Sequence, residues 1–158
     1  MRALYSTLIV AGLAFAPLPA FAMGGSSDAP PTASKAADPA FATGKAAIDK
    51  KDWPAAIASF EKVVAKDAKN ADAFNYLGFA YRNQGNYDAA LKHYASALQV
   101  DPKHKGAHEY LGEAYLKMGN IAKAEEQLKA LDGICTFGCA EFTELKTKVA
   151  AAKAGKSS

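Results

Sequence analysis

Two cysteines, Cys135 and Cys139, carry the most reactive side chains in the 158-residue sequence. Three residues separate them, so they could close a small disulfide ring, exchange with other thiols or bind a metal ion. In an exported protein a close pair is most simply a structural disulfide, which would pin one helical element to the next. The C-x-x-x-C spacing differs from the C-x-x-C of redox motifs, and no βαβ pattern surrounds it. A thiol-disulfide or metal-handling role for the pair stays open as the alternative.

The histidines offer a second candidate chemistry. His104 and His108 stand four apart with Glu109 adjacent, and two histidines at that spacing can share a metal ion on one helix. A third strong ligand is not evident, and His108 occupies a position expected to be packed. No Ser/His/Asp spacing, phosphate-binding glycine loop or H-E-x-x-H helix occurs either. The sequence therefore predicts no enzyme, no cofactor and no metal site.

The elements that must position these residues repeat along the chain. Gly44, Gly78 and Gly112 are 34 residues apart, and the same interval separates three alanines, Ala56, Ala90 and Ala124. A 34-residue period is typical of a stacked helix–turn–helix array. The period predicts three helical hairpins, at about 37–70, 71–104 and 105–138.

The middle copy shows why each unit folds as a hairpin. Its apolar residues fall at helical spacing, in two stripes separated by a turn. Gly85 supplies the left-handed stop of the first helix, Asn86 is a plausible N-cap for the second, and Pro102 ends it. These residues resemble the tetratricopeptide repeat family: Phe74, Leu77, Gly78, Tyr81, Ala90, Tyr94, Ala97 and Pro102.

The resemblance covers roughly residues 37–138 and implies an all-α, right-handed superhelical stack of three repeats. The third copy departs from the pattern at His108, where a large aromatic is usual, and at Thr136, where proline is usual. After it, an amphipathic stretch at about 140–153 predicts a capping helix, which completes a domain over 39–154. The segment from Cys135 onward also resembles the end of some small exported bacterial tetratricopeptide proteins.

The N-terminal segment has another character. Arg2, an apolar run and the small residues of Ala20-Phe21-Ala22 are typical of a secretory signal peptide over residues 1–22. Residues 23–38 read as a flexible linker rich in Gly, Ser, Ala and Pro. We therefore expect export to the periplasm, cleavage after Ala22 and no membrane span thereafter.

The overall charge limits the class of partner. The chain has 19 basic and 16 acidic residues, a formal net charge of +3. Nucleic-acid binding would require a clustered basic face, so we expect no nucleic-acid partner.

The family resemblance also implies a working surface, because the first helices of such repeats line a concave groove. Nine groove residues map onto this sequence by their positions in the repeats: Phe41, Lys45, Asn75, Phe79, Arg82, Asn83, Glu109, Glu113 and Lys117. Phe79 and Arg82 are expected to anchor a ligand. Chaperone adaptors of the family hold a terminal carboxylate with basic residues, but the matching third-repeat positions here are Glu109 and Glu113. These carboxylates would repel such a ligand and select a basic one.

Together these features predict a non-enzymatic interaction module. It would be an exported adaptor or assembly factor that binds a peptide or helix in its groove. Self-association by end-to-end stacking is a further possibility for an array of this type.

Overall fold

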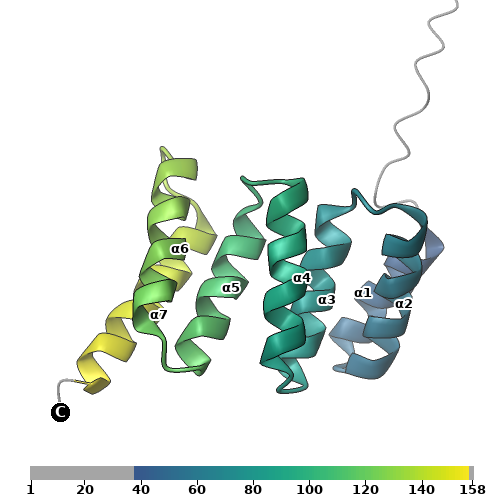
Figure 1. Ribbon diagram of the computed structural model, residues 1–158, viewed down its shortest axis with the longest axis horizontal. Helices are drawn as coiled ribbons and strands as arrows, with labels where there is room; N and C mark the ends of the chain where they lie inside the picture. Colours follow the sequence, from purple (N-terminus) through teal and green to yellow (C-terminus); the bar gives the residue numbers. More distant parts are fainter. Residues whose placement is uncertain (1–37, 157–158) are drawn as a thin grey trace, which may run out of the picture. The chain divides into compact units, whose positions relative to one another are not determined.

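The computed structural model describes residues 38–156, which form seven α-helices and no strand (Figure 1). The predicted signal peptide and nearly all of the predicted linker lie outside the described residues. The helices are α1 (Pro39–Asp49), α2 (Trp53–Lys66), α3 (Ala71–Asn83), α4 (Tyr87–Val100), α5 (Lys105–Lys117), α6 (Ile121–Ile134) and α7 (Ala140–Lys156). The expected all-α stack of helical hairpins is confirmed.

A side-chain cap opens each of the first six helices. Asp38, Asp52, Asn70, Asn86, His104 and Asn120 each accept a hydrogen bond from a backbone N–H of the first turn. Such a cap contributes about 1 kcal/mol to helix stability. Five of these six helices begin at the 34-residue interval, and α1 begins two residues later than the interval places it, at its own cap Asp38.

The turn inside each hairpin uses a left-handed residue. Gly85 and Gly119 adopt φ of +83° and +75° at the ends of α3 and α5. The equivalent residue after α1 is Lys51, with φ +57°. A residue with a side chain loses about 1–2 kcal/mol of stability in this conformation. The first turn is therefore less stable in this respect than the other two, which use glycine.

Neighbouring helices pack in chain order. The hairpins α1/α2, α3/α4 and α5/α6 stand side by side in Figure 1, and α7 contacts both α5 and α6. The buried core consists of three clusters, which the partly buried Tyr81 and Tyr115 connect. The largest fully buried side chains include Tyr94, Phe60, Leu77, Leu131 and Leu145.

The three repeated glycines allow large side chains to pack directly against the backbone of the first helix of each hairpin. A Cβ added to Gly44 would lie 2.7 Å from Phe60, and one added to Gly78 would lie 2.5 Å from Tyr94. Helices α3 and α4 therefore approach each other closely at Gly78. At Gly112 the neighbour is Leu145 of α7, at 2.6 Å from the added Cβ, whereas the period would have placed a side chain of α6 there.

His93 of α4 is a packing residue, although its place in the repeat would put it on the outer surface of the array. Its ring is half-buried between α3 and α4, stacked on Tyr81 at 5.2 Å between centroids and near Phe74 at 6.3 Å. Burial lowers the pKa of His93. The histidine is thus a packing residue of the second hairpin.

Candidate binding groove

Helices α1, α3, α5 and α7 contribute one surface of the array, here called the groove face. Adjacent members of this set meet through side chains and, for α3–α5 and α5–α7, through close backbone approach. All nine predicted groove residues lie on α1, α3 or α5, the first helices of the three hairpins.

Aromatic rings form a row along the groove face. Phe41 of α1 lies 5.7 Å from Tyr76 of α3, edge to face. Phe79 of α3 lies 5.1 Å from Tyr110 of α5 and 6.0 Å from Trp53 of α2. Each ring is partly exposed and partly packed between repeats, so the row joins neighbouring repeats as well as presenting apolar surface.

Two cations are held against this row. Lys45 Nζ donates a hydrogen bond to Tyr76 Oη at 2.9 Å and lies 4.5 Å from the ring centroid. The Arg82 guanidinium lies 5.3 Å from the Phe79 ring and 5.4 Å from the Tyr110 ring. Cation–π contacts of this kind fix the direction of a long side chain.

Glu113 joins three helices by charge. Its carboxylate accepts hydrogen bonds from Arg82 of α3 and Lys148 of α7, and its side chain is only 12% exposed. Burial alone would lower the pKa of Lys148, but the hydrogen bond to Glu113 and the surrounding carboxylates outweigh it and raise that pKa. The negative charge of Glu113 is therefore already balanced inside the protein.

Glu109 lies one turn earlier on α5 and is 6% exposed. Burial raises the pKa of Glu109 to about 7, and the charges of Glu113 and Glu144 add to the effect. A buried carboxyl with a pKa near neutrality carries only part of a charge at pH 7. In this arrangement neither Glu109 nor Glu113 presents a free carboxylate to a ligand.

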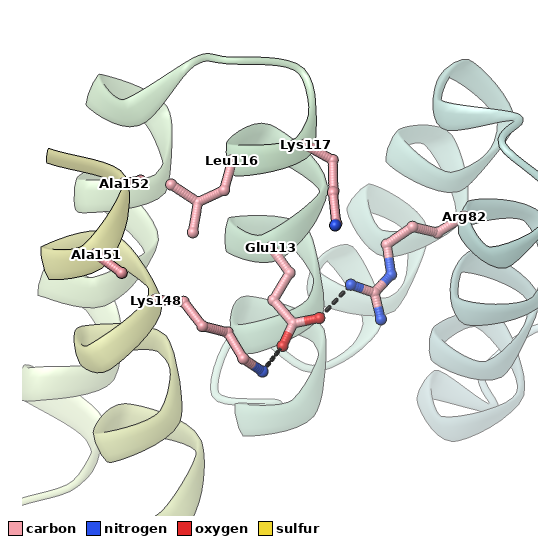
Figure 2. A pocket seen from close by; sticks show the side chains of 7 residues that line it. All are labelled: Arg82, Glu113, Leu116, Lys117, Lys148, Ala151 and Ala152. Carbon is pink, nitrogen blue, oxygen red and sulfur yellow. Dashed lines mark hydrogen bonds and ion pairs between the residues drawn. The ribbon is translucent and has the colours of Figure 1, made fainter. Parts of the chain in front are cut away.

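An open cleft of about 390 Å³ lies beside the Glu113 cluster and is called here the α5–α7 cleft (Figure 2). Seven residues line it: Arg82, Glu113, Leu116, Lys117, Lys148, Ala151 and Ala152. Figure 2 shows Leu116 pointing toward the two alanines of α7, with Lys148 on the same helix below them and Glu113, Lys117 and Arg82 on the other side. The sequence pattern pointed to the α3 and α5 contributors but missed Lys148 and the alanines of α7, because they lie outside the repeat.

The two groove asparagines differ in their surroundings. Asn75 is buried, 5% exposed, and its Oδ1 has no hydrogen-bond partner among the described residues. Asn83 is exposed, and its Nδ2 donates to the Phe79 carbonyl oxygen of its own helix at 2.8 Å. Only Asn83 is therefore accessible to a ligand without rearrangement.

The two histidines near the start of α5 have structural roles. His104 caps α5, with Nδ1 accepting from the Ala107 N–H at 3.1 Å. The buried His108 ring bonds Gln127 and the Pro102 carbonyl oxygen. Within residues 38–156, no group of three His, Cys, Asp or Glu side chains is arranged to hold a metal ion.

The cysteines connect the end of α6 to the start of α7. Cys135 and Cys139 are bonded through their sulfurs in the structure, with a Cα–Cα distance of 5.6 Å that is usual for a disulfide. Gly138, at φ +81°, donates its N–H to the Cys135 carbonyl oxygen at 2.9 Å. The turn places Phe137 fully in solvent.

Family models of the tetratricopeptide repeat match residues 41–97 and 81–134. The two matched ranges lie within the three helical hairpins. The chain therefore belongs to the tetratricopeptide repeat family. No curated protein sequence matches it. None of the helices described between residues 38 and 156 has the length and apolar character needed to cross a membrane.

Solved structures share the fold at low sequence identity. The Yersinia enterocolitica type III secretion translocator chaperone SycD is 20% identical, with a TM-score of 0.67 over 75% of this chain and 84% of that one. PcrH, solved with the chaperone binding region of PopD, is 21% identical, with a TM-score of 0.67 over 74% and 90%. The TPR2B domain of yeast Sti1 is 22% identical, with a TM-score of 0.65 over 71% and 94%.

Proposed function

We propose that the protein is an exported adaptor or assembly factor that binds a peptide or helical segment of another protein on its groove face. The observation that carries the proposal is the α5–α7 cleft, which opens beside an aromatic and cationic row on that face. Aromatic and arginine side chains dominate the energetics of protein interfaces. Tetratricopeptide domains are generally non-catalytic binding modules, and the described residues offer no competing constellation.

Structural relatives support this reading by analogy. PcrH was solved with the chaperone binding region of PopD, SycD with a peptide of the translocator YopD, and the first TPR of RPAP3 with the HSP90 peptide SRMEEVD. Each is a repeat array of similar fold holding a segment of another protein.

Site-specific photocrosslinking tests the proposal. A crosslinking amino acid placed at Asn83 reports on the groove face, and one placed at Lys92, exposed on α4, reports on the opposite helices. Crosslinked in producing cells, the Asn83 variant should capture a discrete partner that the Lys92 variant does not. Equal capture from both positions, or capture from Lys92 alone, would place binding elsewhere.

The anchor role of Phe79 needs a stability control, because its ring packs between repeats. Phe79→Ala is expected to weaken partner binding by about 2 kcal/mol if Phe79 is an interface hot spot. Its effect on folding should be measured alongside, by urea unfolding. Loss of binding in a variant that remains folded supports the groove; loss of both reports only on packing.

A further inference from the structure

We propose that the α5–α7 cleft selects an acidic amphipathic segment, with a side-chain carboxylate at Lys117 and an apolar side chain against Leu116, Ala151 and Ala152. This inference rests on the proposed function and names the chemistry of its ligand. It reverses the expectation from the sequence that the third repeat selects a basic ligand.

The charge of the cleft carries the first step. Its lining contains three cations, Arg82, Lys117 and Lys148, and one anion, Glu113. Glu113 is shared between Arg82 and Lys148, and Lys117 has no hydrogen bond or ion pair among the described residues. The lining therefore has an excess of positive charge, and the exposed Lys117 ammonium is the group left to receive a carboxylate.

The positions of the charged residues along α5 set the orientation in which an acidic segment would bind. Glu109 is two turns before Lys117, which at 1.5 Å per residue is about 12 Å along the helix axis. Glu144, the carboxylate neighbour of Glu109, lies on the same turn of α7 that precedes Lys148. The carboxyl groups of α5 thus lie in its middle turns, at Glu109 and Glu113, and Lys117 is the charged group at its C-terminal end. A bound segment must place its acidic residue over the Lys117 end.

The rest of the lining distinguishes a side-chain carboxylate from a chain terminus. Leu116, Ala151 and Ala152 offer only apolar contact, and no Asn, Gln, Ser or Thr side chain lines the cleft to bond a terminal amide. A volume of about 390 Å³ accommodates a few side chains, not a whole helix. The cleft therefore fits a charged residue and a neighbouring apolar residue from one face of a longer segment.

Three synthetic helical peptides test the inference against the mature protein by isothermal titration calorimetry at low salt. The first has leucines on one face flanked by glutamates, with both ends blocked. The second replaces the glutamates with lysines. The third replaces them with glutamines and leaves a free C-terminal carboxylate. We expect the acidic peptide to bind at least tenfold more tightly than either of the others.

Matched variants locate the binding. Lys117→Glu should weaken the acidic peptide at least tenfold, whereas Lys62→Glu, on the exposed side of α2, should leave its affinity within twofold. Ala151→Glu adds a carboxylate to the cleft and should act like Lys117→Glu. Ala150→Glu, exposed on the same helix but outside the lining, is its control. Circular dichroism at the titration temperature confirms that each variant is folded.

Three results would overturn the inference. These are tighter binding of the basic peptide, tighter binding of the free-terminus peptide, or an acidic peptide whose affinity is the same with Lys117→Glu as with Lys62→Glu. None of them bears on the proposed function, which fails separately if photocrosslinking at Asn83 captures no partner.

Discussion

Replacing Glu109 with glutamine should make the protein more resistant to unfolding above neutral pH while changing little in acid. Glu109 is buried at the α5–α7 contact, with Glu113 and Glu144 as its carboxylate neighbours. Glutamine keeps the shape of the protonated side chain and removes the ionisation. The variant therefore isolates the cost of holding this charge inside the array.

The magnitude follows from the shift in pKa. Burial and the neighbouring carboxylates raise the pKa of Glu109 from 4.5 to about 7 in the folded protein. Below the unfolded value both states are protonated, and no penalty exists. As the pH rises toward the folded pKa, the unfolded chain releases its proton first and stability falls. At 1.36 kcal/mol per pH unit the full penalty is about 3 kcal/mol, reached above pH 7.

Urea unfolding at pH 4.5, 6 and 8 measures the effect. The free energy of unfolding of Glu109→Gln should lie within about 0.5 kcal/mol of the wild-type value at pH 4.5 and exceed it by up to about 3 kcal/mol at pH 8. Glu126→Gln, exposed on α6, is the control and should show no pH-dependent difference. A difference between Glu109→Gln and wild type that is the same at all three pH values would refute this reasoning.

Four further expectations concern the fold and the ends of the chain. Gly78→Leu should lower the melting temperature sharply, because the Cβ of the leucine would lie 2.5 Å from the Tyr94 ring of α4. Overpacking of this kind costs roughly 1–3 kcal/mol or more. An unchanged melting temperature would show that α3 and α4 do not pack as described. Lys51→Gly should raise the free energy of unfolding by about 0.5–1 kcal/mol by relieving the φ of +57°. Intact-mass analysis of the native protein should show cleavage after Ala22; a cytoplasmic species retaining the first residue would rule out export. Thiol labelling of the unreduced, unfolded protein should find neither Cys135 nor Cys139 free, and a reduction potential of about −120 to −270 mV would favour a redox role instead.

The repeat itself was predictable because its determinants are local. Caps, turn glycines and helical stripes depend on residues a few positions apart, so the hairpins and their spacing can be read from the chain. The contact at Gly112 could not be predicted in the same way. There the period indicates Leu128, but Leu145 of α7 occupies the space, and α7 has no counterpart elsewhere in the repeat.

The candidate site was predictable in position but not in electrostatic state. The helical positions of Glu113 and Arg82 place both on the groove face. The sequence does not show that Glu113 is paired, because Arg82 and Lys148 lie 31 and 35 residues away along the chain. Whether a charged residue is available to a ligand depends on such distant partners and on burial. This is why the ligand that we propose is acidic, whereas the sequence pattern favoured a basic one.

The packing of Leu145 against Gly112 affects where repeats can be added to an array of this kind. Because α7 lies against both α5 and α6, it stands where the first helix of another hairpin would pack. An additional 34-residue hairpin could therefore be inserted upstream of Lys105, between hairpins that already pack against each other. New copies at this position would lengthen the array. The contacts among α5, α6 and α7, with the cleft and its charges, would stay unchanged. The array could thus be lengthened in its middle while the α5–α7 end, where we propose that the ligand binds, keeps its geometry.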